Sequence, residues 1–239
     1  MTDQHTAKAF DSDLQELGRL VAEMGGLAEK EIADSVDALA RRDTDLAQRV
    51  AALDATIDSL QRQIEDKAVL TITRRQPMAV DLREIVAALR LANDLERIGD
   101  LAKNIAKRVI ALNADFPPPA LIRGVEHMTE LVLAQLTAAL DSFARRDVGK
   151  AMEVWRNDAE IDAVCTSVFR ELLTYMMEDP RNISFCIHLL FCAKNIERMG
   201  DHATNIAETV HYMIEGRPIM DQRPKGDMTA AFSAPRRTA

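Results

Sequence analysis

Aromatic residues are scarce in this chain, making up only 4% of its 239 residues, and glycine and proline number just 9 and 8. Sheets favour aromatic and β-branched residues, and loop-rich folds favour glycine and proline. Alanine and leucine abound instead, and 47% of the residues are hydrophobic. The composition therefore predicts a substantial core built from long helices.

Cysteine, positive charge and long apolar runs are also in short supply. The three cysteines are odd in number and lack the spacing of metal ligands, which predicts buried, reduced thiols: Cys165, Cys186 and Cys192. A formal net charge of −8 argues against a nonspecific nucleic-acid binder. The longest apolar run, 183–193, falls short of the ~20 residues that span a bilayer, and residues 1–13 are too polar for a signal peptide. We expect a cytoplasmic protein.

One motif occurs twice and dominates the sequence. Residues 93–107 and 194–208 agree at eight of fifteen positions when they are slid by 101, with the shared frame E-R-x-G-D-x-A-x-N-I-A. Within each copy Glu, Asp and Asn recur every four residues, and on a helix this spacing places them on one face. Apolar residues occupy the opposite side. Each copy therefore predicts a packed helix that presents carboxylates outward.

A glycine lies inside each copy, at Gly99 and Gly200. Within a helix, glycine costs ~1 kcal/mol relative to alanine, and carboxylates spaced by four residues repel each other. A small residue beside carboxylates would let a cation or another backbone approach. We therefore expect alanine at these positions to keep or raise stability and to weaken binding. A solvated acidic face that was simply duplicated is the alternative.

The chain divides into two similar halves. Residues 1–9 are expected to form a disordered tail, 10–115 a first three-helix bundle, 116–215 a second, and 216–239 a disordered basic tail. The boundary rests on the prolines at 117–119, which cannot continue a helix. Pro77 fits the first turn of a third helix. The predicted fold class is all-α, with two tandem bundles related by internal duplication.

The repeat extends beyond the doubled motif. At an offset of 104, the tetrapeptide A-R-R-D at 40–43 recurs at 144–147, and D-A-T-I-D at 54–58 recurs as D-A-E-I-D at 158–162. Aspartate after such a stretch is a common helix N-cap. A period of about 100 residues excludes a short-period solenoid.

Carboxylates from two helices of each half are expected to converge. The middle and third helices of a half should run antiparallel, so an Asp/Asp pair faces a Glu/Asp pair along one groove. Such a set favours a hard cation with oxygen ligands, because adjacent carboxylates cannot all stay ionised without compensation. The predicted metal ligands are Asp54, Asp58, Glu96 and Asp100 in the first half, and Asp158, Asp162, Glu197 and Asp201 in the second.

Salt bridges could neutralise these grooves without any metal. Arg97, Arg198 and Lys103 lie close enough in sequence to do so. His202, which follows Asp201, could reach a metal, although only the second copy has a histidine there.

The doubled motif resembles that of the PhoU family, the phosphate-transport accessory proteins of bacteria. The family's twofold E/D-x-x-x-D signature matches Glu96–Asp100 and Glu197–Asp201, and R-Q-P-M-A-V-D-L-R at 75–83 is similar to the family's turn into its third helix. The second copy lacks that run around Pro180. The resemblance covers about residues 10–215 and implies two three-helix bundles with surface metal sites.

The resemblance also implies a function. Such a protein is a cytoplasmic regulator that links the phosphate ABC transporter, through its ATPase subunit, to a PhoR-type sensor histidine kinase, and represses the phosphate-starvation regulon when phosphate is plentiful. Iron, zinc, manganese or magnesium would be the bound ion. A homodimer is expected, nucleic acid is not, and the membrane is reached only through partners.

Two other functions compete with this one. A carboxylate-bridged di-metal enzyme on a helical bundle needs Glu-x-x-His, but Glu96 and Glu197 are each followed three residues later by glycine. A purely structural helical scaffold with solvated acidic grooves is the other alternative. We therefore expect a non-enzymatic adaptor.

Overall fold

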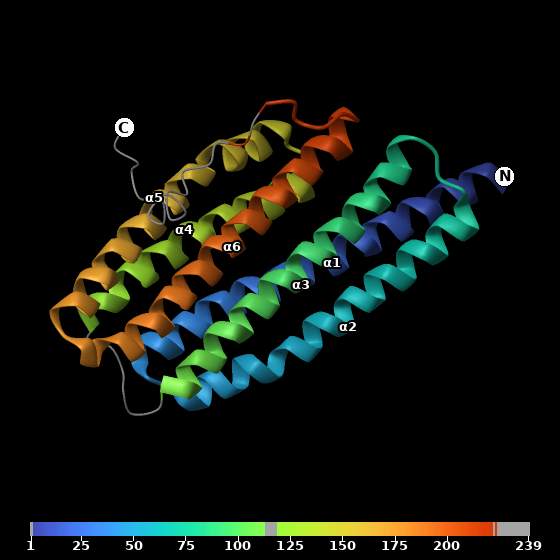
Figure 1. Cartoon of the computed structure of the whole chain (residues 1–239). Helices are drawn as coiled ribbons and strands as arrows, with labels where there is room; N and C mark the ends of the chain where they lie inside the picture. The colour runs from blue at the N-terminus through green and yellow to red at the C-terminus, as the bar shows by residue number, and fades with distance from the viewer. Residues whose placement is uncertain (1, 113–118, 222, 224–239) are drawn as a thin grey trace, which may run out of the picture.

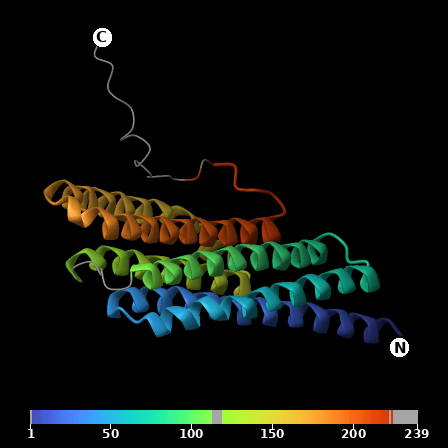
Figure 2. The same cartoon turned by 60° about the horizontal axis from the view of Figure 1, so that its bottom comes forward.

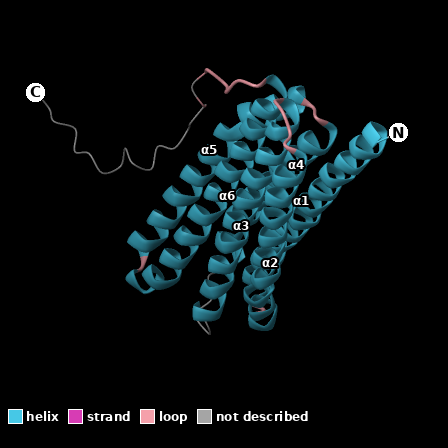
Figure 3. Cartoon of the chain, turned by 90° about the vertical axis from the view of Figure 1, so that its right-hand side faces the viewer, coloured by secondary structure: helices cyan, strands magenta, loops and turns pink. Residues whose placement is uncertain are grey.

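The residues that the computed structural model describes, 2–112, 119–221 and 223, form helices, the turns between them and a short segment after the last helix, without any strand (Figure 3). The elements are α1 (Thr2–Arg41), α2 (Thr44–Arg75), α3 (Val80–Leu112), α4 (Pro119–Arg145), α5 (Val148–Glu178), the 3₁₀ turn η1 (Pro180–Asn182) and α6 (Ile183–Glu215). The expected fold class is confirmed. None of these helices, within the described ranges, carries an apolar stretch that could cross a bilayer.

The first two helices of each half are joined by the same tight turn. Arg42 and Arg146 adopt left-handed backbone conformations, with φ of 60° and 52°. The residues that follow them, Asp43 and Asp147, are the N-caps of the next helices and accept a hydrogen bond from the backbone N–H three residues on. The repeated R-R-D sequence therefore ends one helix and starts the next within two residues.

Six helices form two three-helix bundles that lie side by side (Figure 1). The helices α1, α2 and α3 pack on one another, as do α4, α5 and α6; across the boundary α3 packs along α6, and α1 against α4. In Figure 2, α1 and α2 lie on one side, α5 and α6 on the other, and α3 between them. The bundles therefore share one hydrophobic core.

The apolar stripes predicted from periodicity form this core. Leu95, Ile98 and Ile105 of α3 are fully buried, as are Ile196 and Ile206 of α6. The three cysteines are free and buried, as expected. Burial of one stripe on each helix fixes the rotation of that helix, and so decides which polar residues lie at the edges of the core.

Several expected boundaries are wrong. α1 begins at Thr2, so residues 2–9 are helical rather than a disordered tail; this stretch holds neither proline nor glycine to stop a packed helix from extending. Pro77 does not start the third helix, because left-handed backbone at Gln76 and Ala79 delays α3 to Val80. The basic tail expected over 216–239 is described only in part, for residues 216–221 and 223.

Candidate functional site

The eight predicted ligand residues form two clusters, one in each bundle. The first acidic cluster comprises Asp54 and Asp58 of α2 with Glu96 and Asp100 of α3; the second comprises Asp158 and Asp162 of α5 with Glu197 and Asp201 of α6. Four of the eight are buried: Asp54, Asp158, Asp162 and Glu197. Of the motif carboxylates expected to face outward, only Glu197 is among them. Their helices meet along these positions, so the polar faces border the core.

A lysine pairs with two carboxylates of the first acidic cluster. Lys103 Nζ lies 2.5 Å from Asp54 Oδ2 and 3.7 Å from Asp100 Oδ1, which joins α2 to α3. The hydrogen bond to Asp54 raises the pKa of Lys103 above its ordinary value. The salt bridge proposed from the sequence for this lysine is therefore present.

Glu96 of the first cluster has a raised pKa and a buried oxygen without a hydrogen-bond donor in the described part of the chain. Burial raises its pKa; Arg97 opposes the rise, and the other carboxylates of the cluster reinforce it. Its Oε2 atom accepts no hydrogen bond from the described residues, although Arg97 Nε lies 3.4 Å away. A buried oxygen without a donor is a position where an added cation would be stabilised.

A fifth carboxyl lies next to the first cluster and was missed in the sequence. Glu31 of α1 is fully buried, and neither of its oxygens has a hydrogen-bond partner among the described residues. Burial, followed by the negative charge of Asp54, raises its pKa to about 8. The signal was available: a glutamate stands between Ala28 and Ile32 on the apolar face of its helix.

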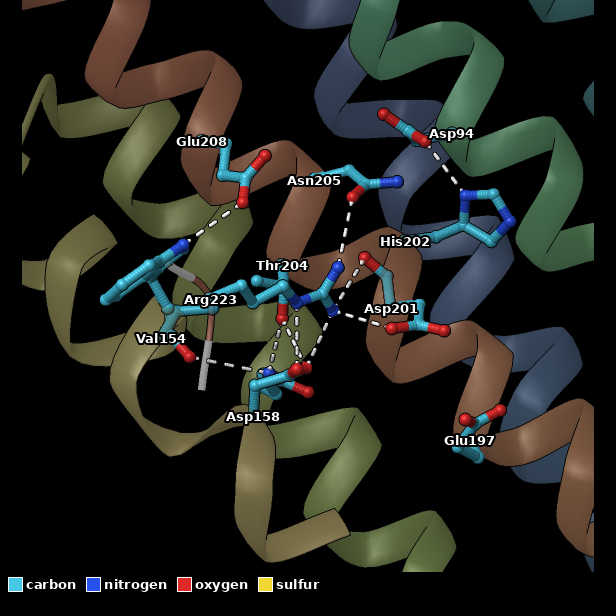
Figure 4. A network of polar contacts seen from close by, with 12 residues as sticks. Asp94, Val154, Asp158, Glu197, Asp201, His202, Thr204, Asn205, Glu208 and Arg223 are labelled. Carbon is cyan, nitrogen blue, oxygen red and sulfur yellow. Dashed lines mark hydrogen bonds and ion pairs between the residues drawn. The ribbon is translucent and has the colours of Figure 1, made fainter. Parts of the chain in front are cut away.

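An arginine from outside the bundle binds to the second acidic cluster (Figure 4). Arg223 Nε and Nη2 donate to the two carboxylate oxygens of Asp158, each at 2.8 Å, and Nη2 also donates to Asp201 Oδ1 at 2.8 Å. No local pattern could have found Arg223, because it is 65 residues from Asp158 and lies in the tail predicted to be disordered.

The remaining contacts of the second cluster are polar and short. Thr204 Oγ1 donates a hydrogen bond to Asp158 Oδ1 at 2.9 Å and accepts one from Gln135 Nε2, also at 2.9 Å. Lys194 Nζ donates to Glu197 Oε1 at 2.8 Å. Burial raises the pKa of Glu197, although Lys194 acts to lower it. Glu197 Oε2 has no hydrogen-bond partner among the described residues.

The two motif glycines serve packing rather than access from solvent. A Cβ on Gly99 would lie 3.0 Å from Ile57 Cδ1, and one on Gly200 would lie 2.9 Å from Ile161 Cδ1. Both isoleucines belong to the core. The atoms that approach each glycine are therefore an isoleucine methyl of the middle helix and a side-chain oxygen of the first helix, from Glu31 or Gln135, rather than another backbone. Room for a cation beside them remains a prediction.

A bound metal would have to displace the basic side chains. Across the described ranges, no group of three or more histidine, cysteine, aspartate or glutamate side chains could hold a metal ion as it stands. The donors nevertheless fit a hard cation, because they are carboxylate oxygens and Glu96 and Glu197 each keep one buried oxygen without a hydrogen bond. Metal binding by the eight carboxylates remains a prediction.

His202 points away from the second cluster. Its Nδ1 lies 2.9 Å from Asp94 Oδ1 of α3, so this pair joins the two bundles (Figure 4). Arg108 of α3 also contacts the second bundle, because its Cζ atom lies 4.1 Å from the centroid of the Phe191 ring on α6. The sequence suggested that His202 could reach a metal, but this contact with Asp94 does not support that suggestion.

The doubled acidic cluster corresponds to a known domain. The family described as "PhoU domain" matches the chain twice, over residues 21–109 and 125–210. The chain belongs to the PhoU family. Each match falls within one three-helix bundle and contains one acidic cluster, so the PhoU domain is the unit of the internal duplication.

PhoU proteins of several bacteria are similar to the chain over nearly its whole length. The phosphate-specific transport system accessory protein PhoU homolog of Rhizobium meliloti (strain 1021) is 56% identical over 234 residues, covering 98% of this chain and 99% of the relative. The protein of the same name from Caulobacter vibrioides (strain NA1000 / CB15N) is 51% identical and covers 94% of this chain and 98% of the relative.

Solved PhoU structures share the fold. PhoU from Pseudomonas aeruginosa, 40% identical, superposes with a TM-score of 0.83 and covers 87% of this chain and all of that chain. The phosphate transport system regulatory protein PhoU from Streptococcus pneumoniae, 27% identical, superposes with a TM-score of 0.81 over 88% of this chain and 99% of that one.

Proposed function

We propose that this chain is a non-enzymatic regulatory adaptor of phosphate uptake. The observation that carries the proposal is the double PhoU-domain match, supported by relatives named as accessory proteins of a phosphate-specific transport system. A similar solved protein is named a phosphate transport system regulatory protein. A protein that assists a transporter acts by contact, so its function lies in its surfaces.

In this proposal the chain works in the cytoplasm and has two partners. It contacts the ATPase subunit of the phosphate ABC transporter and a PhoR-type sensor histidine kinase, and it represses phosphate-starvation genes while phosphate is plentiful. It reaches the membrane only through these partners and binds no nucleic acid. A second copy of the chain, forming a homodimer, is the remaining proposed partner.

An extended face suits such contacts. The 40 residues of α1 span ~60 Å, and packed helices keep that face rigid. The turn between α2 and α3 exposes large apolar side chains, among them Met78 at 80% and Val80 at 50%. Exposed apolar residues that lie together favour a protein contact. This turn contains the R-Q-P-M run that the second copy lacks, so it gives the first bundle a surface of its own.

The acidic clusters supply the proposed switch. Iron, zinc, manganese or magnesium bound at carboxylates would turn a repulsive negative surface neutral or positive, and would order the side chains that border it. Partner affinity should therefore depend on metal occupancy. Lys103 and Arg223 each pair with two carboxylates of a cluster and so offset only part of its negative charge.

Deleting the gene tests the proposal directly. A phosphate-starvation reporter should stay on in phosphate-rich medium and be switched off again when the intact chain is supplied. A reporter that stays off in the deletion strain would refute the regulatory function. Capture of the transporter's ATPase subunit or of the sensor kinase, with and without chelator, tests the switch, because equal recovery would confine any metal to a structural role.

A further inference from the structure

Arg223 makes a forked contact within the second acidic cluster, although it belongs to the segment that follows the last helix. Besides the three 2.8 Å contacts to Asp158 and Asp201, its Nη1 lies 3.4 Å from Asn205 Oδ1, and its Nη2 lies 3.4 Å from the Asp201 carbonyl oxygen (Figure 4). A guanidinium that forks onto one carboxylate and bridges to a second makes the strongest kind of ion pair.

This ion pair is shielded from water. The exposed fraction of the side chain is 16% for Arg223 and 5% for Asp158. Charge pairs on an open surface contribute little to stability, whereas removing one partner of a shielded pair leaves an uncompensated charge. Asp158 therefore needs a cation, and Arg223 supplies it.

The segment before Arg223 lies along the second bundle. Gly216, with a φ of 73°, ends α6, and Figure 1 shows the chain turning back there. Pro218, Ile219 and Asp221 then line a cavity of about 440 Å³ together with Trp155 of α5. The segment thus runs beside α5 and α6, with most of its residues exposed, before Arg223 enters the cluster.

The length of this segment suits Arg223 in particular. Asp201 lies fourteen residues before the end of α6, or ~21 Å along the helix axis. Arg223 lies eight residues beyond that end, and eight extended residues span at most ~26–29 Å. Eight residues are therefore enough for Arg223 to reach the cluster, whereas Arg217, only two residues past the helix, cannot reach it.

The two clusters obtain their positive charge in different ways. Lys103 of α3 neutralises Asp54, but the equivalent position on α6 is Thr204, whose hydroxyl donates to Asp158 and carries no charge. Arg223 takes over this task from outside the repeat. The cation of the first cluster is carried by a helix of the bundle, whereas that of the second is carried by a chain segment outside the helices, which can move away together with the side chain.

We propose that Arg223 is a tethered occupant of the second acidic cluster and keeps divalent cations out of it until it leaves the cluster and the stretch 216–221 lifts away. The inference rests on the cation-binding part of the proposed function and makes the two clusters unequal. A tethered group competes at an effective concentration of roughly millimolar, so we expect it to weaken binding of a divalent ion at this cluster about tenfold or more.

Binding of Mn²⁺ alone to the full chain tests this. Titration calorimetry with dialysis should show that Arg223→Ala binds one more ion than the wild type at micromolar Mn²⁺, or binds the same number with about tenfold higher affinity at one site. Arg217→Ala is the matched control, because it makes the same change in net charge on an exposed residue of the same segment. Adding Asp201→Asn to Arg223→Ala should remove the gained site.

A second measurement needs no metal. Trp155 is the sole tryptophan, and its Nε1 donates to Glu208 Oε1 at 3.0 Å beside the docked segment. Arg223→Ala should shift its fluorescence to the red as the segment lifts, while Arg217→Ala and Arg223→Lys should shift it less. Lysine keeps the charge but cannot fork onto Asp158.

Equal Mn²⁺ binding by the wild type, Arg223→Ala and Arg217→Ala would overturn the proposal, whether or not the first cluster binds the ion. So would an unchanged Trp155 spectrum in Arg223→Ala. Neither result would argue against the proposed adaptor function, because repression of the starvation reporter is measured independently.

Discussion

Glu31 and Gln135 lie at equivalent positions of α1 and α4, 104 residues apart, and each points at the motif glycine of its own bundle. A Cβ on Gly99 would lie 3.1 Å from Glu31 Oε2, and one on Gly200 would lie 3.3 Å from Gln135 Oε1. The two side chains have the same length and differ in charge. One bundle therefore buries a carboxyl group where the other buries an amide, next to an acidic cluster in both cases.

Replacing Glu31 with glutamine should stabilise the protein more at pH 8 than at pH 5. The pKa of Glu31 is raised from an ordinary value of 4.5 to about 8. Between these values the unfolded chain has lost a proton that the folded chain keeps, so the free energy of unfolding falls as pH rises. Glutamine does not titrate and is already accommodated at position 135.

Thermal melts of chelator-treated protein at the two pH values check this prediction. The difference in Tm between Glu31→Gln and the wild type should grow with pH. The exposed Glu23→Gln serves as the control and should show little change. A Glu31→Gln effect that is the same at both pH values would contradict it.

Removing one carboxylate from each cluster should lower metal content. Asp100→Asn deletes a charged oxygen donor from the first predicted site, and Asp201→Asn deletes one from the second, where it is compared in the Arg223→Ala background because Arg223 holds cations off that cluster. Elemental analysis of protein purified without chelator measures the loss. Binding should also weaken as pH falls, because protons compete for the same oxygens. Unchanged metal content in both comparisons would argue against these clusters as metal sites.

Alanine at the motif glycines should destabilise the protein, contrary to expectation from helix propensity alone. The new methyl group would crowd Ile57 or Ile161 at about 3 Å, and overpacking costs ~1–3 kcal/mol, against a gain of ~1 kcal/mol in propensity. We therefore expect Gly200→Ala to lower the free energy of unfolding by up to about 2 kcal/mol, and Gly99→Ala somewhat less.

Gly26→Ala is the matched control for these variants. It also lies within a helix, but no atom lies within 4 Å of the place that the new methyl group would occupy, so alanine should stabilise the protein by about 1 kcal/mol there. Urea denaturation of the three variants measures the difference. Stabilisation in all three would show that the core isoleucines move aside freely, and shortening Ile161 to valine should restore stability to Gly200→Ala.

Most of the fold follows from signals that are local in the sequence. The apolar periodicity specifies which face of each helix is buried, the doubled R-R-D stretch specifies the turns capped by Asp43 and Asp147, and Pro119 starts α4. The offset of about 100 residues specifies that the plan is used twice. Each of the helix and turn signals acts within a few residues of the chain, so the sequence alone could reveal it.

The partners of the carboxylates were decided only by the tertiary structure. The approach of Glu31 to Asp54 depends on how α1 packs against α2, and the pairing of His202 with Asp94 depends on how the two bundles meet. Arg223 reaches Asp158 because the segment after α6 folds back by the length that it has. Such contacts join residues tens of positions apart, and helical spacing carries no information about them. The sequence thus determined on which helices the acidic side chains lie, and the tertiary structure determined which of them pair with a cation.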